Sequence, residues 1–164
     1  MKLRNFLVAI AFIAVSAVSV FAEDVADPRV KKALDSLGIK YTVNDSKNYK
    51  VVYKMESDPD RSQLVFVVSK TSTYKNLEVR EIWTIAAVLD AYPDEETIQR
   101  LYTMNSTTKI GAWAMEINDD GEVWVIYTAK VLAAMSPKEL TDIIYFVAEV
   151  GDEMEVDLVG DDEY

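Results

Sequence analysis

The sequence predicts an α+β domain in which an antiparallel sheet of about five to six strands packs against helices, in the order αβββ(β)αββα. Two segments begin with helix-capping residues, and between them apolar residues recur at every second position with short polar turns in between. This alternation is typical of antiparallel strands that have one buried and one wetter face. The length of 164 residues suits one domain.

The N-terminal segment, residues 1–22, has the pattern of a secretory signal peptide. Lys2 and Arg4 precede an apolar run over residues 6–20. Val20 and Ala22 then supply the small residues that a signal peptidase requires three positions and one position before its cleavage site. The run is shorter than the roughly 20 residues that span a bilayer. We therefore expect cleavage after Ala22, export to the periplasm or the medium of a bacterium, and no stable membrane anchor afterwards. An uncleaved anchor is the alternative.

Residues 23–158 form the predicted single domain, and residues 159–164 are expected to be a flexible acidic tail. The chain carries 28 acidic and 17 basic residues, a net charge of −11, and cleavage would remove two basic residues and leave −13. Such a surface repels phosphate groups, because nucleic-acid binding depends on Lys and Arg. We therefore expect no nucleic-acid partner.

Few of the residues that usually carry catalysis are present. Histidine and cysteine are absent from the sequence, which excludes Ser–His–Asp and Cys–His triads, zinc sites built on those ligands, and disulfides. The five glycines form no phosphate-binding loop. A Ser69–Lys70 dyad is formally available, but nothing in the sequence positions it. We expect a non-catalytic protein with no cofactor and no metal.

The first helix is predicted to have Asp27 as its N-cap, Pro28 at its first position and Gly38 at its end. Its apolar stripe consists of Val30, Ala33, Leu34 and Leu37. Three short strands follow, separated by the turns "NDSKN" and "SDPDR". They are expected over residues 39–43, 49–56 and 63–69.

The next segment, residues 77–89, fits two templates. Val79, Ile82, Trp83, Ala86 and Leu89 have helical spacing. Five β-branched residues in the same segment favour a strand, and periodicity alone does not separate the two. We interpret the segment as a long strand that can hold a bulge, with a helix as the alternative.

A second helix is expected after Pro93, where the acidic run at residues 94–96 suits the positive end of a helix. The hairpin that follows has its turn at "DDG", with the glycine in a left-handed bulge position. The expected cross-strand pairs are Asn118–Glu122, Ile117–Val123, Met115–Val125 and Trp113–Tyr127. A calcium loop is a weaker reading of the turn, because Glu122 stands too close to the glycine.

The other face of this hairpin holds the candidate partner-binding residues Trp124, Ile126 and Glu116. Large apolar side chains on the wetter face of a sheet are typical of contact surfaces, where aromatic residues are enriched. The alternative is that a helix of the same chain covers them.

The last helix is predicted from a capping box, in which Ser136 and Glu139 flank Pro137 at the first helical position. Its apolar stripe consists of Leu140, Ile143, Ile144, Val147, Met154 and Leu158. Gly151 interrupts the stripe and is expected to weaken the helix.

The stretch "LYTMNSTTKIGAWAMEINDDGEVWVIYTAKV" and the capped helix after it contain Asn105, the acidic turn at residues 118–121 and the stripe over residues 140–147. In these features the chain resembles the YbjN family, described as bacterial sensory-transduction regulators. The resemblance spans most of residues 27–158. It implies a fold like that of the type III secretion chaperones, often dimeric, and it supplies no catalytic residues. The familiar members are cytoplasmic, and the export signal departs from them.

Three functions are left open by the sequence. The first is an exported, non-catalytic, chaperone-like or regulatory module that binds another protein or a second copy of itself. The second is a module that holds a small apolar molecule. Its candidate lining residues, for which ordinary core packing is the alternative, are Tyr41, Tyr49, Tyr53, Phe66 and Trp113. The third is a carboxylate-pair hydrolase, for which no sequence feature places the two acids.

Overall fold

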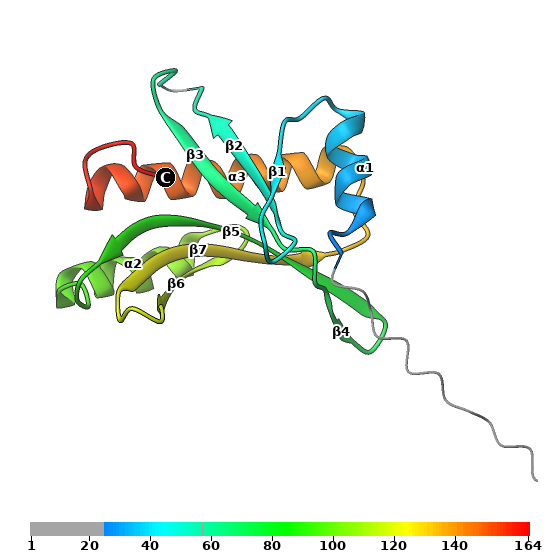
Figure 1. Cartoon of the computed structure of the whole chain (residues 1–164). Coiled ribbons are helices and arrows are strands. Elements are labelled where there is room, and N and C mark those ends of the chain that lie inside the picture. Colours follow the sequence, from blue (N-terminus) through cyan, green and yellow to red (C-terminus); the bar gives the residue numbers. More distant parts are fainter. Residues whose placement is uncertain (1–24, 57) are drawn as a thin grey trace, which may run out of the picture.

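The computed structural model describes residues 25–56 and 58–164, which fold into three helices and one seven-stranded sheet (Figure 1). In chain order the elements are α1 (Pro28–Ser36), β1 (Thr42–Val43), β2 (Tyr49–Lys54), β3 (Ser62–Val67), β4 (Ser72–Tyr74), β5 (Leu77–Leu89), α2 (Glu95–Thr107), β6 (Ala112–Ile117), β7 (Val123–Leu132) and α3 (Pro137–Leu158). The predicted signal peptide and its cleavage site lie outside the described residues. None of the helices in the described part of the chain has the length and apolar character needed to cross a membrane.

The strands form an antiparallel sheet in the order β1-β2-β3-β5-β7-β6, with β4 paired to the start of β5. The predicted α+β class is confirmed. The expected count of five to six strands is too low, because β4 turns back onto β5 through a tight turn in which Lys75 has a left-handed φ of 53°. Residues 77–89 form a strand, as their β-branched residues indicated, and its register shifts between Ile85 and Ala87.

α1 has the predicted ends. The Asp27 carboxylate accepts a hydrogen bond of 2.8 Å from the backbone N–H of Arg29, and Gly38 has a φ of 68°. Three of the four predicted stripe residues are buried, but Leu37 is 48% exposed because it lies beyond the last helical turn, at the C-cap. The strand expected over residues 39–43 is reduced to the two residues of β1.

The β6–β7 hairpin has the register predicted from the sequence, including the pairs Ile117–Val123, Met115–Val125 and Trp113–Tyr127. The side-chain oxygen of Asn118 accepts the backbone N–H groups of Asp120 at 3.0 Å and Glu122 at 2.9 Å. Gly121 has a φ of 86°, as the left-handed bulge position requires. The polar residues of this turn are therefore accounted for by the backbone they organise.

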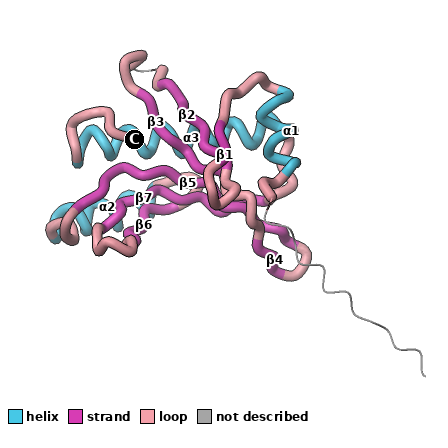
Figure 2. Tube along the Cα trace, viewed as in Figure 1, coloured by secondary structure: helices cyan, strands magenta, loops and turns pink. Residues whose placement is uncertain are grey.

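The helices lie on one face of the sheet, called here the inner face (Figure 2). α3 packs across β3, β5 and β7, α2 packs beside β6, and α1 packs against α3. The core between sheet and helices includes Leu34, Val67, Ile82, Val125, Ile144 and Val147. Burial of each such side chain stabilises the fold by about 1.5–3 kcal/mol.

The free edge of β6 is closed by a side chain of α2. Asn105 accepts a hydrogen bond of 2.6 Å from the backbone N–H of Trp113 and donates one of 3.2 Å to the carbonyl of the same residue. The amide thus makes the pair of bonds that a neighbouring strand would make. This contact gives Asn105, part of the family resemblance in the sequence, a physical role.

The sheet divides between β3 and β5. These strands pair only where Val65–Val67 face Ile82–Thr84, and beyond that point they separate, as Figure 1 shows. The Gln63 side chain donates to Thr84 Oγ1 and to the Ile85 carbonyl, both at 2.7 Å. These side-chain bonds replace part of the missing backbone pairing. The region between the two diverging strands is called here the sheet split.

Gly151, expected to be a weak point in α3, is a position where this helix packs tightly against the sheet. A Cβ atom there would lie 2.5 Å from Thr84 Cγ2 and 3.2 Å from Gln63 Nε2. The helix is continuous through this position and begins with the predicted capping box of Ser136 and Glu139. Glycine is therefore required by the packing of α3 on the sheet split.

We expect Gly151→Ala to lower the free energy of unfolding by about 1–3 kcal/mol, because the added methyl group overpacks the contact with Thr84. Inside a helix the same change otherwise stabilises by about 0.8–1.0 kcal/mol, so the sign of the effect is diagnostic. Urea unfolding followed by far-UV circular dichroism measures it.

Thr84→Ser provides the matched control, because it removes Cγ2 and keeps the hydroxyl group that bonds Gln63. The double variant Gly151→Ala/Thr84→Ser should recover part of the loss relative to the two single changes. A Gly151→Ala protein at least as stable as the wild type would contradict the packing described here.

Candidate functional site

The face of the sheet opposite the helices carries a row of aromatic and aliphatic side chains from β3, β5 and β7. This outer aromatic surface consists of Phe66, Trp83, Ile85, Val88, Trp124 and Ile126. The rings of Phe66 and Trp83 are stacked with centroids 4.2 Å apart, and those of Trp83 and Trp124 are 6.4 Å apart. At one end of the row, Lys50 Nζ lies 5.9 Å from the centre of the Phe66 ring.

The three predicted partner-binding residues lie on this face. Trp124 is half-buried and Glu116, directly opposite it on β6, is exposed. Ile126 is only 3% exposed, although the helices pack on the other face; it lies between its cross-strand partners Ile85 of β5 and Ala114 of β6. Trp124 and Glu116 are therefore accessible to another molecule, whereas Ile126 supports the surface from beneath.

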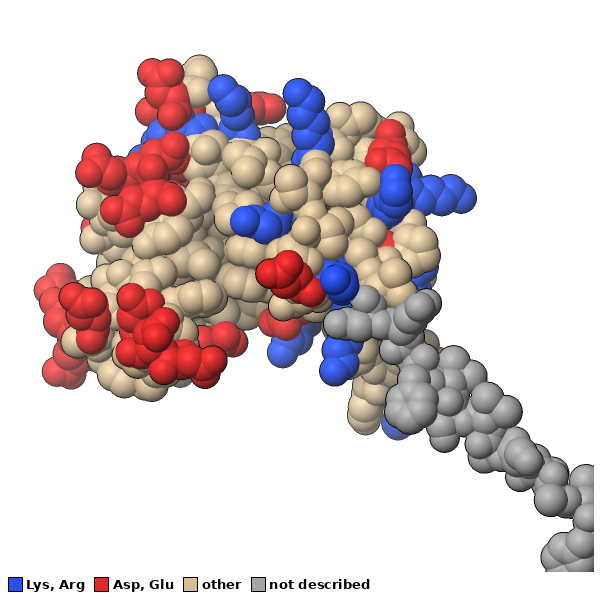
Figure 3. Space-filling model, in the orientation of Figure 1, with Lys and Arg blue, Asp and Glu red and all other residues tan. Residues whose placement is uncertain are grey.

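Charge is distributed unevenly around this surface (Figure 3). Residues 25–89 contain 11 basic and 8 acidic residues, whereas residues 90–164 contain 4 basic and 18 acidic ones. Acidic side chains gather at the end of the molecule that holds the β6–β7 turn, the start of α2 and the end of α3. Glu116 lies directly opposite Trp124 and Glu122 stands two positions before it in the chain, so the aromatic row ends at the acidic part of the surface.

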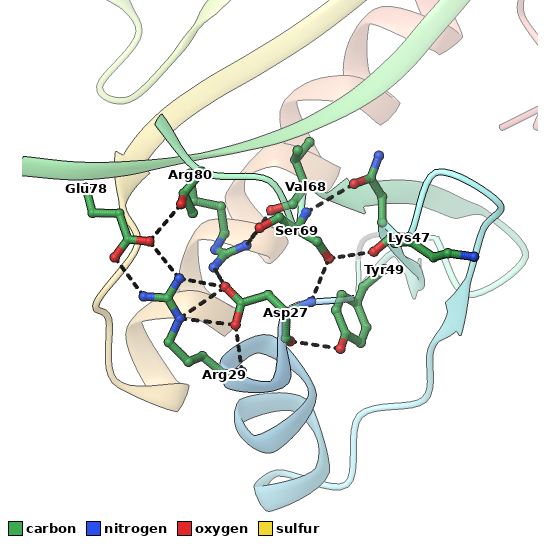
Figure 4. Close-up of polar contacts among 10 residues, drawn as sticks. Asp27, Arg29, Lys47, Tyr49, Val68, Ser69, Glu78 and Arg80 are labelled. Atoms are coloured by element: carbon green, nitrogen blue, oxygen red, sulfur yellow. Dashed lines mark hydrogen bonds and ion pairs between the residues drawn. The ribbon is translucent and has the colours of Figure 1, made fainter. Parts of the chain in front are cut away.

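A cluster of charges, built around the buried pair Asp27–Arg80, joins α1 to the sheet at the opposite end of the molecule (Figure 4). Arg80, 2% exposed, bonds the Asp27 carboxylate at 2.5 Å and the Val68 carbonyl. Arg29 bonds both Asp27, at 2.7 Å, and Glu78, at 2.7 Å through each of two nitrogens. We call Asp27, Arg29, Glu78 and Arg80 the Asp27 cluster.

The cluster shifts the protonation of its acids. Burial opposes the charged form of Asp27, but the hydrogen bonds from Arg29 and Arg80 outweigh it and hold the pKa of Asp27 well below its usual value. Hydrogen bonds from Arg29 and Thr71 lower the pKa of Glu78 to about 2. Both carboxylates are therefore ionised throughout the neutral range, as partners of the two arginines.

The serine of the formal Ser69–Lys70 dyad is part of this same region. Ser69 Oγ accepts the backbone N–H of Asp27 at 3.0 Å and donates to the Lys47 carbonyl at 2.5 Å, while Lys70 is exposed. Both bonds of the Ser69 hydroxyl therefore go to the backbone, where they hold the start of α1 against the loop between β1 and β2.

A second group of charges lies at the sheet split. Arg61 bonds Asp152 at 2.8 Å and Glu155 at 3.3 Å, and Glu155 is completely buried. Asp162 completes a set of three carboxylates whose oxygens lie within 4.8 Å of one another. Burial raises the pKa of Glu155, and this effect is partly opposed by backbone N–H groups that bond its carboxylate. The guanidinium of Arg61 is the cation that this acidic group holds.

The segment after α3, expected to be a flexible tail, contacts the sheet split. The backbone N–H of Ser62 bonds the Asp162 carboxylate at 2.9 Å, and that of Leu64 bonds the Tyr164 carbonyl oxygen at 3.0 Å. In return, the backbone N–H groups of Glu163 and Tyr164 bond Glu155 Oε1 at 2.6 and 3.0 Å. The segment thus occupies the edge of β3 that β5 leaves open.

The aromatic residues considered as a ligand lining are not gathered around one space. Tyr41 packs on Tyr49 near α1, Tyr53 packs on α3, and Phe66 belongs to the outer face. Trp113 alone of the five lines an open groove of about 190 Å³ between α2 and α3, whose apolar walls also include Met104, Phe146 and Val150.

Sequence reasoning missed the buried charges. Glu155 carried a signal, because it stands four residues after Gly151 and eight after Val147, on the apolar stripe of the last helix. Arg80 likewise stands at an inward position of β5. Arg61 gave no such signal, because it was read as part of a polar turn.

No protein-family model and no curated protein matches the sequence. Among the solved structures that match is the crystal structure of YbjN from E. coli, a proposed transcription regulator, with a TM-score of 0.47 and 9% sequence identity over 79% of this chain and 86% of that chain. The likeness is to the YbjN fold alone.

We expect Asp27→Asn to lower the free energy of unfolding at pH 7 by about 3–5 kcal/mol, because it leaves the buried Arg80 without its counter-charge. Asparagine preserves the N-cap, so the loss reports on the ion pairs. The pKa of Asp27 is depressed in the folded state, so its stabilisation is present above the unfolded pKa of about 3.9 and is lost as the pH falls through the folded value. Urea unfolding should therefore show a smaller difference between the two proteins at pH 3 than at pH 7.

Asp35→Asn is the matched control, since Asp35 is an exposed carboxylate on the same helix, paired with Lys31. Its effect should stay below about 1 kcal/mol. Equal losses for the two variants, or no loss for Asp27→Asn, would contradict the role given to the Asp27 cluster.

Proposed function

We propose that the protein is an exported, non-catalytic module of the chaperone-like or regulatory kind, which binds another protein through the outer aromatic surface. The observation that supports this most directly is the stacked row of Phe66, Trp83 and Trp124 on a face of the sheet that the helices leave free. Contiguous apolar patches of this kind are uncommon on monomeric proteins and mark interaction sites.

The charges beside the row indicate the chemistry of the partner. Glu116 and Glu122 flank Trp124, and the whole second half of the chain is strongly acidic. A complementary polypeptide would place an aromatic or aliphatic group on Trp83 and Trp124 and a Lys or Arg beside Glu116. Charge complementarity of this type sets the orientation of the partner and the rate of association more than the affinity.

A second candidate function is the binding of a small apolar molecule in the groove between α2 and α3. The apolar side chains that line that groove, Trp113 among them, favour it. A thermal-shift screen tests this function, because a ligand at 100 times its dissociation constant adds about 2.7 kcal/mol to the free energy of unfolding.

We expect Trp124→Glu and Glu116→Lys each to weaken capture of the protein partner at least tenfold, the first by charging the apolar row and the second by reversing the charge beside it. The measurement is quantitative affinity capture from an extract of the source cells, followed by titration of the captured protein. Glu116 is exposed, so Glu116→Lys should leave the fold intact. Raised salt should weaken binding to the wild type more than to Glu116→Lys.

Tyr102→Glu serves as the control, because Tyr102 is a 79% exposed aromatic residue on α2, away from the outer face. This variant should bind like the wild type. If all three variants capture the same proteins with the same affinity, the outer aromatic surface is not the binding surface.

A further inference from the structure

The sheet split leaves an open strand edge within the sheet. On β3, the backbone N–H groups of Ser62 and Leu64 point towards the place that β5 vacates, and they are bonded by residues of the segment 161–164. An open strand edge is a template for an added strand, which contributes backbone hydrogen bonds from one side. The segment 161–164 supplies these bonds from within the chain.

This segment bridges both sides of the split. The backbone N–H of Leu64 on β3 donates to the Tyr164 carbonyl oxygen, and the Tyr164 phenol group lies close to the backbone of β5 at Val88. Asp162 reaches Ser62 with its carboxylate. Between them, the backbone N–H groups of residues 163 and 164 bond Glu155 Oε1. These contacts therefore fit an extended segment in which an acidic residue, here Asp162, stands two positions before an aromatic residue, here Tyr164.

The segment is held by few contacts apart from these. Residues 161–163 are exposed and Tyr164 is only partly buried. Gly160 connects them to α3 with a φ of 86°, a conformation that favours glycine and lets the chain turn back from the helix to the sheet. A short segment held mainly by hydrogen bonds at the surface opens at low cost in free energy.

We propose that the sheet split is an acceptor site for an extended acidic segment of a partner protein, with an Asp or Glu two residues before an aromatic residue, and that residues 161–164 fill the site in its absence. This inference rests on the proposed function, since it adds a second contact for the same kind of partner. Leu64, which bonds the segment, is two residues before Phe66 on β3, so a partner bound in the split would continue onto the outer aromatic surface.

The groups that recognise the segment are fixed before it binds. Glu155 is positioned by Arg61, which is also bonded to Asp152 of α3. The N–H groups of Ser62 and Leu64 are positioned by the pairing of β3 with β2. Because residues 161–164 are tethered, they compete with a partner at an effective concentration on the order of millimolar. A partner segment can displace residues 161–164 only if its additional contact with the outer aromatic surface gives it enough extra affinity.

The test uses a chain that ends at Gly160 and a synthetic peptide with the sequence of residues 158–164. In this shortened chain the amides of Ser62 and Leu64 should exchange with solvent about tenfold faster than in the full chain, because their acceptors are gone. Millimolar peptide should restore the protection, and the full chain should bind the peptide about tenfold more weakly than the shortened one. Hydrogen exchange measured by NMR reports both effects.

Two matched controls make the result specific. A peptide in which the residues equivalent to Asp162 and Tyr164 are both alanine should not restore protection. Gly160→Ala in the full chain keeps every contact group but strains the left-handed turn, so it should increase the exchange of Ser62 and Leu64 in the same direction as removal of the segment. Should the shortened chain fail to fold, this second variant still decides the matter.

The inference is overturned if the peptide binds both chains equally, if the alanine peptide protects as well as the parent peptide, or if exchange at Ser62 and Leu64 does not depend on residues 161–164. Trp124→Glu separates this inference from the proposed function. The variant should leave peptide binding in the split unchanged while it weakens capture of the whole partner. Loss of one result without the other therefore shows which of the two surfaces was wrongly assigned.

Discussion

The close contact between α3 and the sheet at Gly151 is the constraint on which the other features depend. A helix that approaches the sheet this closely needs a position without a side chain, and Thr84 and Gln63 fill the space that is left. The contact keeps α3 on the inner face, where α1 packs against it, and so leaves the aromatic row on the outer face free. It also brings Asp152 and Glu155 to the place where β3 and β5 separate.

Two groups of buried charge hold the ends of this arrangement. The Asp27 cluster ties the first helix to β5, and Arg61 ties the start of β3 to the end of α3. Removing charges from water is costly, so such pairs add little net stability compared with apolar residues. Their contribution is to specify one arrangement of the helices. In a chain without disulfides, these two sets of directional contacts fit only one packing of the helices on the sheet.

Features of the structure that depend on residues close together in the sequence could be predicted. Turn chemistry and alternation were enough to predict the register of β6 and β7, and capping residues were enough to predict both ends of α1 and the start of α3. Contacts between distant residues could not be predicted, because no local pattern records them. Asp27 and Arg80 are 53 positions apart, and Arg61 and Glu155 are 94 apart. Of the candidate site, only Trp124 and Glu116 could be predicted, because the alternation of side chains along β6 and β7 places both of them on the outer face.

The amide of Asn105 has a consequence for how the protein behaves when crowded. A bare edge strand recruits neighbouring molecules into continuous sheets and, in time, fibrils. By occupying both backbone groups of Trp113, Asn105 interrupts the row of free bonds that such growth would need along β6. One polar side chain on a helix thereby makes the far margin of the sheet a poor template for polymerisation.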